Sequence, residues 1–272
     1  MKDLFSLKDK VVVVTGGFGL LGQQFALAIA GQGGRVALID VVDKPRMAIP
    51  SFMDLFERQD RIKAFKADIT NRAELEQTLL KIKETWEVPF GLVNNAALDS
   101  PPNAPASENG PFETYPLESL SKVIDVNLKG LVVTCQVFGA AMAEQGRGSI
   151  INISSIYGML SPNQDIYEYK RKAGVDWYKP VGYSVTKSGV LNLTRYLATY
   201  WAKKGVRVNT LTPSGIFNNQ DETFLEEYTK RIPIGRMAKP DEMNGAVVFM
   251  LSEGSTYMTG SNLVVDGGWT AW

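Results

Sequence analysis

A short β-branched strand followed by regularly spaced glycines constrains the fold of this chain more than any other feature. Residues 10 to 22 read Lys-Val-Val-Val-Val-Thr-Gly-Gly-Phe-Gly-Leu-Leu-Gly. The apolar run is too short for a helix and is β-branched, which indicates a buried parallel strand. Gly16, Gly19 and Gly22 follow it, and an apolar-periodic helix begins among these glycines. Such an order of elements predicts a dinucleotide-binding βα unit.

The physical requirements of a bound pyrophosphate explain the glycines. They allow a tight turn, a close approach of the backbone to the phosphates and tight packing of helix on strand, while the helix N-terminus supplies unpaired N–H groups. The alternative, an ordinary turn, does not require this order of elements. We therefore predict that the residues of the turn bind the cofactor: Gly16, Phe18, Gly19, Leu20 and Gly22.

An acidic residue ends the next predicted strand, residues 35 to 39. Asp40 lies eighteen residues after the last glycine of the turn. A carboxylate at this place accepts hydrogen bonds from a ribose 2′-hydroxyl and repels a 2′-phosphate, so we predict NAD rather than NADP. Taken alone, Asp40 could equally be a solvated strand end or a helix cap.

Composition argues against several classes of function. The 272 residues carry 29 basic and 29 acidic side chains, which leaves no electrostatic footprint for nucleic acid or an anionic membrane. We see no targeting segment and expect no bilayer-spanning run, so we expect a soluble, cytoplasmic protein. The chain has no histidine and one cysteine, Cys135, which we expect to be a buried inert thiol. We predict no metal site.

Strand-like and helix-like stretches alternate along the whole chain. This alternation predicts an α/β fold: one Rossmann-type domain over residues 1–272, with a doubly wound parallel sheet flanked by helices on both faces. Ligands bind such sheets at the carboxyl ends of the strands. Candidate site residues stand at five predicted strand ends: Asp40, Asp68, Asn94, Ser155 and Pro213.

Tyr183 and Lys187 are four residues apart on a predicted helix, residues 182 to 203, so they share one face of it. There the ammonium of Lys187 is expected to lower the pKa of the Tyr183 phenol from about 10 towards working pH. Such a phenol can exchange a proton with a substrate hydroxyl. The same helix repeats the spacing at Tyr200 and Lys204, but only the first pair starts the helix, after the strand that ends at Ser155.

These residues together resemble the short, single-domain branch of the short-chain dehydrogenase/reductase family over essentially the whole chain. The shared motifs are Thr15-Gly-Gly-Phe-Gly-Leu-Leu-Gly22, Asp68, Asn94-Asn-Ala-Ala97, Asn127, Ser155, Tyr183-Ser-Val-Thr-Lys187, Pro213-Ser-Gly215 and Val265-Asp-Gly-Gly268. The resemblance implies that Ser155 orients the substrate oxygen and Tyr183 is the general acid/base. It also implies that Lys187 lowers the tyrosine pKa and holds the nicotinamide ribose, and that Asn127 supports a water-linked proton path. Further implied cofactor contacts are Asp68 (to adenine), Ile69, Asn95, Ala96, Tyr183, Lys187, Pro213, Gly215 and Ile216.

The chain departs from the family pattern in three places. Leu20 stands where the short branch usually has glycine, a pattern commoner in larger sugar-nucleotide epimerases and dehydratases, although the sequence leaves no room for their C-terminal domain. Ala97 replaces a glycine. Ser155 and Tyr183 are 28 residues apart, about twice the family's expected spacing, which predicts an insertion at about 161–180 beside the active site.

The predicted insertion combines consecutive basic residues with aromatic ones. Aromatic rings stack on sugars and basic groups hold phosphate or carboxylate, so we predict a polar, sugar-derived substrate that could carry an anionic group. The alternative is a surface loop whose aromatic residues pack on a neighbouring subunit. The chain is also similar to oxidoreductases of bacterial surface-sugar and flagellin modification. The predicted substrate contacts are Ser155, Tyr157, Lys170, Arg171, Trp177 and Tyr178.

The predicted function is that of an NAD-dependent oxidoreductase that interconverts a secondary alcohol and a ketone. An epimerase or dehydratase with transient oxidation, and a binding module that senses NAD without reacting, remain alternatives. The expected partner is a small-molecule substrate, with no nucleic acid and no membrane. The resemblance also implies a homo-oligomer, a tetramer or dimer built on helices 117–144 and 182–203, although burial within one chain would equally explain their apolar residues: Val132, Val133, Leu191, Leu193 and Tyr196.

Overall fold

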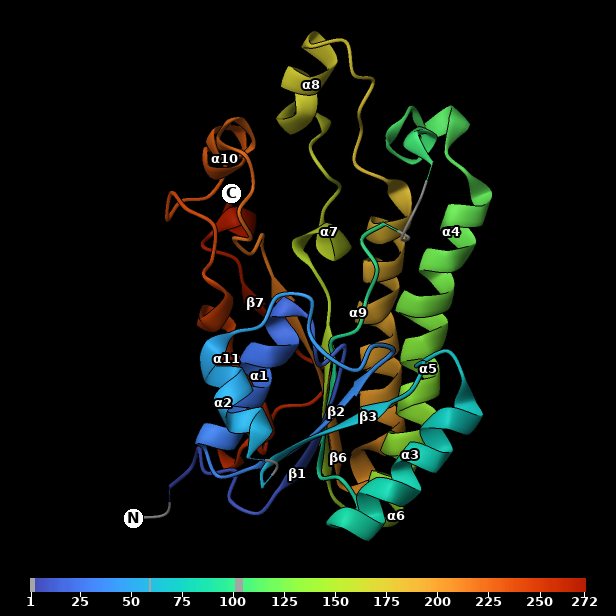
Figure 1. The fold of residues 1–272 in the computed structure, drawn as a ribbon, viewed down its shortest axis with the longest axis vertical. Helices are drawn as coiled ribbons and strands as arrows, with labels where there is room; N and C mark the ends of the chain where they lie inside the picture. Colours follow the sequence, from blue (N-terminus) through green and yellow to red (C-terminus); the bar gives the residue numbers. More distant parts are fainter. Residues whose placement is uncertain (1–2, 59, 101–104) are drawn as a thin grey trace.

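A twisted parallel sheet forms the centre of the computed structural model, which describes residues 3–58, 60–100 and 105–272 (Figure 1). Within these residues the strand order is β3-β2-β1-β4-β5-β6-β7, and every neighbouring pair is parallel. The predicted fold class is confirmed. The strands are β1 (Val11–Thr15), β2 (Arg35–Asp40), β3 (Ile62–Lys66), β4 (Gly91–Asn94), β5 (Gly148–Ile153), β6 (Val206–Pro213) and β7 (Asn262–Val265).

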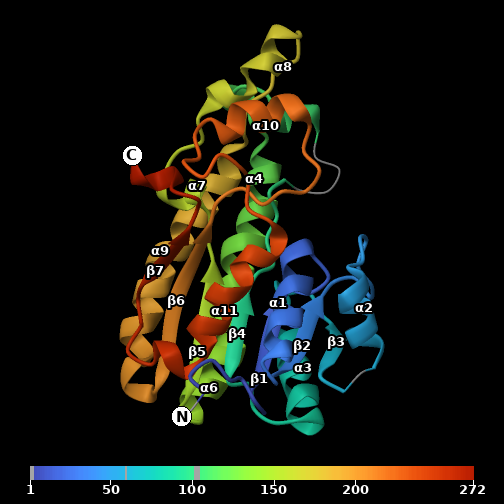
Figure 2. The ribbon, with the colours of Figure 1, turned by 90° about the vertical axis from the view of Figure 1, so that its left-hand side faces the viewer.

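Helices cover both faces of the sheet (Figures 1 and 2). They are α1 (Leu20–Gly31), α2 (Pro50–Glu57), α3 (Arg72–Thr85), α4 (Leu117–Ile124), α5 (Leu131–Thr134), α6 (Ala140–Glu144), α7 (Ile156–Met159), α8 (Glu168–Lys172), α9 (Val181–Trp201), α10 (Glu222–Thr229) and α11 (Asn244–Leu251). Short 3₁₀ turns lie at Ala106–Asn109, Phe112–Thr114, Gln164–Tyr167, Ala202–Lys204, Pro240–Met243, Glu253–Ser255 and Trp269–Ala271.

Alternate side chains of β1 enter two separate hydrophobic layers. Val11 and Val13 belong to the layer beneath α3, α5 and α9, whereas Val12 and Val14 belong to the layer beneath α1, α2 and α11. Successive strand residues point to opposite faces, so a strand buried on both faces must be apolar throughout. This explains the continuous valine run. The strand order reverses between β1 and β4, which opens the binding crevice at their carboxyl ends.

The predicted helix 117–144 is one continuous rod in which α4, α5 and α6 are joined by π-helical turns at Asp125–Gly130 and Cys135–Gly139. By length and composition this is the one helix in the described residues that could cross a membrane. The expectation that no run reaches such a length is therefore wrong. Over half of its most apolar stretch, 56%, is buried inside the protein, and it packs beside α9 over the same hydrophobic layer. We read it as a core helix.

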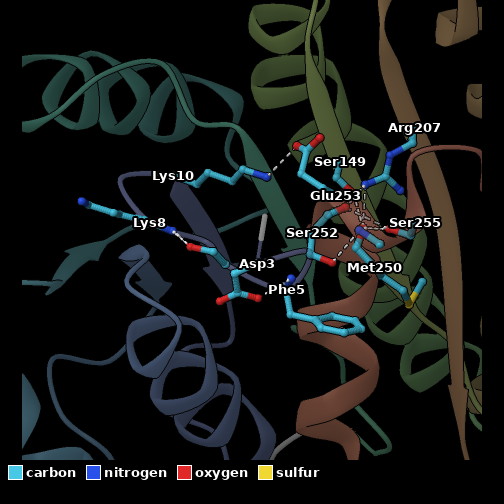
Figure 3. Close-up of polar contacts among 12 residues, drawn as sticks. Asp3, Phe5, Lys8, Lys10, Ser149, Arg207, Met250, Ser252, Glu253 and Ser255 are labelled. Carbon is cyan, nitrogen blue, oxygen red and sulfur yellow. Dashed lines mark hydrogen bonds and ion pairs between the residues drawn. The ribbon is translucent and has the colours of Figure 1, made fainter. Parts of the chain in front are cut away.

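The edge of the sheet at the strands' amino ends is tied together by polar contacts (Figure 3). Arg207 donates to the carbonyl oxygen of Met250 at 2.8 Å, and the hydroxyl of Ser149 donates to the same oxygen at 2.7 Å. Lys10 pairs with Glu253 at 3.3 Å. Burial lowers the pKa of Arg207, and the charge of Glu253 opposes this. These contacts satisfy the C-terminal carbonyls of α11, so this edge serves stability.

Two small helices were not predicted. Glu168–Lys172 forms α8 inside the predicted insertion, which projects beyond the carboxyl edge of the sheet in both ribbon views. Helix α7 is a single turn that starts at Ser155, whose hydroxyl accepts a hydrogen bond from the N–H of Tyr157 at 3.2 Å. Both are too short to show a helical periodicity in the sequence.

Candidate active site

The glycine turn between β1 and α1 leaves room that only glycine provides. Gly16 has a φ of +61°, and a Cβ there would lie 2.9 Å from the Cα of Ala96. A Cβ on Gly22 would lie 2.3 Å from the carbonyl oxygen of Gly16. Gly19 caps α1 without a side-chain hydrogen bond, and the first turn of the helix contains no acidic residue. The helix N-terminus is therefore free to bind an anion, which fits a dinucleotide pyrophosphate.

Asp40 is half-buried beside this turn. One of its carboxylate oxygens accepts the N–H of Phe18 at 3.0 Å, and the other accepts the N–H of Val42 at 3.3 Å. The ring of Phe18 packs edge-on against Phe52 and Phe56, away from the carboxylate that its N–H contacts. The carboxylate thus stands next to the turn with lone pairs to spare, in a position that suits a ribose hydroxyl and opposes a phosphate.

The loops after β3 and β4 are held by their own side chains. Asp68 accepts hydrogen bonds from the N–H and the hydroxyl of Thr70, each at 2.8 Å, so it closes its loop whether or not it also binds a ligand. Asn95 donates to the carbonyl oxygens of Thr15 and Gly16 at 3.1 Å each. The N–H groups of Asn95 and Ala96 both donate to the hydroxyl of Thr15. The β4 loop is therefore locked against the glycine turn.

A pocket of about 520 Å³ opens at the carboxyl edge and contains Ser155, Tyr183 and Lys187. Ser155 follows the end of β5 as the N-cap of α7, while Tyr183 and Lys187 lie on the first turns of α9. Lys187 is buried and donates to the carbonyl oxygen of Ile153 at 2.8 Å, and its nitrogen is 5.6 Å from the centre of the Tyr183 ring. Further predicted cofactor residues line the same pocket: Asn95, Pro213, Gly215 and Ile216.

Asn127 lies behind this pocket, in the first π-helical turn of the long helix. Its side chain accepts the N–H of Leu98 at 2.7 Å and donates to the carbonyl oxygen of Leu98 at 2.8 Å. It also donates to the hydroxyl of Thr186 at 3.1 Å. Asn127, Ile69 and Lys187 line one small cavity beneath the site. The asparagine thus joins the β4 loop to α9.

The pKa of Tyr183 is raised to about 12, chiefly by burial and then by the charge of Asp99, while the hydroxyl of Ser155 acts in the opposite direction. Burial lowers the pKa of Lys187 to about 8, opposed by Asp99. The pKa of Tyr183 is therefore raised on balance rather than lowered towards working pH, and the effect of Lys187 on it stays a prediction. Desolvation disfavours both charged forms, the phenolate and the ammonium.

The structure separates the predicted substrate residues into two groups. Tyr157, Lys170 and Trp177 line the pocket. Arg171 instead folds the insertion: it donates to the carbonyl oxygens of Trp177 at 3.0 Å and Gln164 at 2.9 Å, and its guanidinium lies 4.8 Å from the ring centre of Tyr178. Tyr178 faces a second cavity. Neither residue lines the pocket that contains Tyr183, and their role as substrate contacts stays a prediction.

The aromatic residues of the insertion pack within the chain. The rings of Tyr167 and Trp177 are 4.1 Å apart, and Tyr167 stacks on Phe224 of α10 at 5.9 Å. The hydroxyl of Tyr169 donates to Asp221 at the start of α10. The insertion and α10 therefore cover the pocket together.

Sequence reasoning missed one ion pair in the pocket wall. Lys179, at the end of the insertion, donates to both carboxylate oxygens of Asp99, in the loop after β4. The ammonium of Lys179 is 5.3 Å from the centre of the Tyr183 ring. Asp99 follows a strand end and could have been selected on that ground. Lys179 could not, since its partner is 80 residues away.

The thiol of Cys135 is 1% exposed and accepts a weak hydrogen bond from Asn94 at 3.4 Å. Burial raises its pKa to about 12, so the thiolate needed for nucleophilic chemistry is not available at neutral pH. The predicted burial of this thiol is confirmed.

Comparison with known proteins shows the same family along the chain. A family model described as short chain dehydrogenase matches residues 10–227. The chain is 31% identical to 2-dehydro-3-deoxy-D-gluconate 5-dehydrogenase of Bacillus subtilis, covering 99% of this chain and 98% of that protein. It is 30% identical to D-arabinitol 2-dehydrogenase (ribulose-forming) of Candida tropicalis, covering 98% and 95%. The crystal structure of a Leptospira borgpetersenii short chain dehydrogenase with bound NAD⁺ superposes with a TM-score of 0.84 at 33% identity, covering 99% and 96%.

Proposed function

This chain belongs to the short-chain dehydrogenase family, and from that membership we propose that it is an NAD-dependent dehydrogenase of sugars or polyols. It would interconvert a secondary alcohol and a ketone, with Ser155, Tyr183, Lys187 and Asn127 as its catalytic set. One observation supports the proposal: Ser155, Tyr183 and Lys187 line the same pocket, next to a glycine turn whose shape fits a pyrophosphate.

The bound cofactor would supply a hydride acceptor or donor, and the protein's own residues would handle the proton. Because its pKa is raised to about 12, Tyr183 is a neutral phenol at pH 7 and is ready to give its proton to a carbonyl oxygen. In the oxidative direction it must first lose that proton, so oxidation should speed up as the pH rises. Ser155 would hold the substrate oxygen, and Lys187 would hold the nicotinamide ribose. Asn127 would keep the Leu98 loop in place.

The cofactor would lie along the carboxyl edge, from the loop of Asp68 and Ile69 across the glycine turn to Pro213 and Gly215. Asp40 supports NAD over NADP, because its carboxylate faces the turn and would repel a 2′-phosphate. Asp40→Ser should raise the KM for NAD and lower the KM for NADP, each by roughly tenfold. Asp43→Ser is the matched control, since Asp43 pairs with Lys66 at 2.9 Å. Unchanged KM values in the Asp40 variant would contradict the assignment.

A homo-oligomer in the cytoplasm is also part of the proposal. A cavity of about 690 Å³ on the outer side of α9 and the long helix is lined by apolar side chains such as Val132, Leu193 and Tyr196, with polar ones at Arg72, Gln136, Glu144 and Lys204. Tyr196 is 62% exposed, so it is available to a second copy of the chain. Contiguous exposed apolar surface of this kind supports self-association.

Net formation of NADH tests the function. The purified protein would be incubated with NAD at alkaline pH and with a panel of polyols, sugars and sugar acids, while NADH absorbance is followed. We expect turnover that is lost in Tyr183→Phe, a variant that should still bind NAD. Product formation without net NADH would instead indicate an epimerase or dehydratase. NAD binding with no reaction on the panel would indicate a sensing module.

A further inference from the structure

The charged side chains of the pocket leave little positive charge for a substrate. Within the described chain, five charged residues line it: Asp99, Lys170, Lys179, Lys187 and Asp221. Three are cations and two are anions, so the availability of each cation decides whether an anionic substrate is favoured. The contacts of each group answer that question.

The cation nearest to Tyr183 from the insertion is already neutralised. Lys179 has a side chain only 12% exposed and donates to both carboxylate oxygens of Asp99, whose side chain is 60% exposed. A desolvated ammonium held by two charge-assisted hydrogen bonds does not leave its partner readily. The exposed carboxylate, in contrast, has about four lone-pair sites, of which Lys179 uses two.

The other cations either make contacts elsewhere or lie away from Asp99 and Lys179. Lys187 donates to the carbonyl oxygen of Ile153 and belongs to the catalytic set. Lys170 lies over the Trp177 ring, 4.4 Å from its centre, on α8 at the outer end of the insertion. Arg171 is held by backbone carbonyls outside the pocket.

Acceptors are more available than donors. Asp221 caps α10 by accepting the N–H of Phe224 at 2.8 Å and also accepts the hydroxyl of Tyr169, so it is partly engaged. Asp99 retains exposed acceptor capacity beside the tyrosine. A second carboxylate, Glu108, is fully buried in the neighbouring cavity, which Lys179 also lines. Around Lys179, therefore, the two carboxylates of Asp99 and Glu108 accompany one ammonium in the described chain.

We propose that the Asp99–Lys179 pair makes this pocket selective for a neutral polyol or its ketose over a sugar acid. The inference rests on the proposed function and names its substrate class. A hydroxyl can donate to Asp99 and accept from Lys179 without disturbing the pair. A substrate carboxylate can only accept, would lie beside Asp99, and would have to compete with it for the ammonium.

The wild-type protein provides the first test. We expect kcat/KM for D-arabinitol and D-threitol to exceed that for D-gluconate by roughly tenfold or more, because like charges placed together are strongly disfavoured. A preference for D-gluconate would overturn the inference and leave the dehydrogenase proposal intact. No turnover of any alcohol on the panel would instead overturn the dehydrogenase proposal itself, so the two failures are distinguishable.

Variants of the pair test its role directly. Asp99→Asn frees the ammonium, and we expect kcat/KM for D-gluconate to rise about tenfold while that for D-arabinitol falls. Lys179→Met should make the discrimination against D-gluconate stronger. The double variant, Asp99→Asn with Lys179→Met, has neither charge. Its change in kcat/KM for D-gluconate should therefore differ from the sum of the changes in the two single variants. An unchanged D-gluconate to D-arabinitol ratio in Asp99→Asn would refute the assignment.

A matched control comes from an ion pair at the opposite edge of the sheet. Glu87 pairs with Arg147 at 3.5 Å, and Glu87→Gln removes one charge far from the pocket. We expect its substrate ratio to equal that of the wild-type protein. Circular dichroism and thermal melting of each variant would show whether it is folded, and the wild-type ratio tests the inference even if a variant is not.

Discussion

Helix α9 and the 3₁₀ turn that continues it carry two tyrosine–lysine pairs with the same four-residue spacing and similar distances between lysine nitrogen and ring. The lysine nitrogen lies 5.6 Å from the ring centre in the pair Tyr183 and Lys187, and 5.8 Å in the pair Tyr200 and Lys204. The four-residue spacing therefore sets the distance between the lysine nitrogen and the tyrosine ring in both pairs. It does not distinguish a candidate catalytic pair from a surface pair.

The surroundings of the two pairs differ. Lys187 is 4% exposed and hydrogen-bonded to the end of β5, and Tyr183 stands in the pocket beside Ser155. Tyr200 is 59% exposed and stacks on Tyr196 at the other end of the helix, and Lys204 lies in a 3₁₀ turn after it. Burial at the carboxyl edge perturbs the pKa values of the first pair. The comparison shows that tertiary environment turns a common spacing into candidate chemistry.

Removing the hydroxyl of Tyr183 or, separately, that of Tyr200 should give the largest difference in activity between the two pairs. Tyr183→Phe deletes the proposed proton donor, and we expect kcat to fall by roughly 10² to 10⁴. Tyr200→Phe leaves the pocket untouched, and we expect kcat within about twofold of wild type. Steady-state kinetics with NAD binding measured in parallel checks both. Comparable losses in the two variants would mean that position on the helix does not matter.

The two lysines should differ in how stability depends on pH. The folded pKa of Lys187, about 8, lies below its ordinary value of 10.5, so between these pH values the unfolded chain binds more protons at this position. This buried ammonium therefore costs stability below pH 8, and that cost is relieved as pH rises to 10.5. At pH 7 we expect Lys187→Met to exceed wild type in free energy of unfolding by up to about 3 kcal/mol, and this advantage should shrink as the pH rises.

Denaturant unfolding at several pH values between 7 and 10 checks the lysine prediction. The tyrosines with raised pKa values are present in both the wild type and Lys187→Met, so their contributions cancel when the two free energies of unfolding are subtracted. Lys204→Met serves as the control, and we expect its difference from wild type to stay flat over this range. A flat difference for Lys187→Met as well would argue against a desolvated ammonium.

The middle of the helix offers a third contrast between its buried and exposed faces. The buried hydroxyl of Thr194 accepts hydrogen bonds from Asn152 at 2.9 Å and Thr210 at 2.8 Å. Thr194→Val leaves both donors unpaired, and we expect a loss of roughly 1 to 3 kcal/mol in unfolding free energy. Among the residues that the structure describes, the hydroxyl of Thr199 bonds only to carbonyls of its own helix, so Thr199→Val should change stability by less than about 0.5 kcal/mol. Equal losses would contradict this view of the two faces.

The smallest change in the catalytic constants is expected for a substitution at the exposed C-terminal end of α9. Tyr200→Asp places a charge on the apolar surface that we expect a second copy of the chain to cover. The molar mass measured by light scattering should fall, while the catalytic constants per chain change by less than about threefold. A variant with unchanged mass would mean that this surface is not the interface, and Thr199→Val provides a neighbouring control.

Local patterns predicted the framework of this protein. The valine run, the glycine spacing and the alternation of elements sufficed for the parallel sheet, because periodicity and turn chemistry act over a few residues. The predicted strand at residues 35 to 39 and the predicted helix at 182 to 203 correspond to β2 and α9, whereas α7 and α8 were missed. The family motifs also selected Ser155, Tyr183 and Lys187, which the fold brings into one pocket.

Long-range packing decided what those patterns leave open. The Asp99–Lys179 pair joins residues 80 positions apart, and no local pattern marks either partner for the other. Within the basic run of the insertion, Lys170 lines the pocket whereas the adjacent Arg171 is turned to backbone carbonyls. The direction of the Tyr183 pKa shift likewise depends on burial and on Asp99. Sequence determines which groups are present and how neighbours are spaced, but desolvation and charge at a site come from segments that only the folded chain brings together.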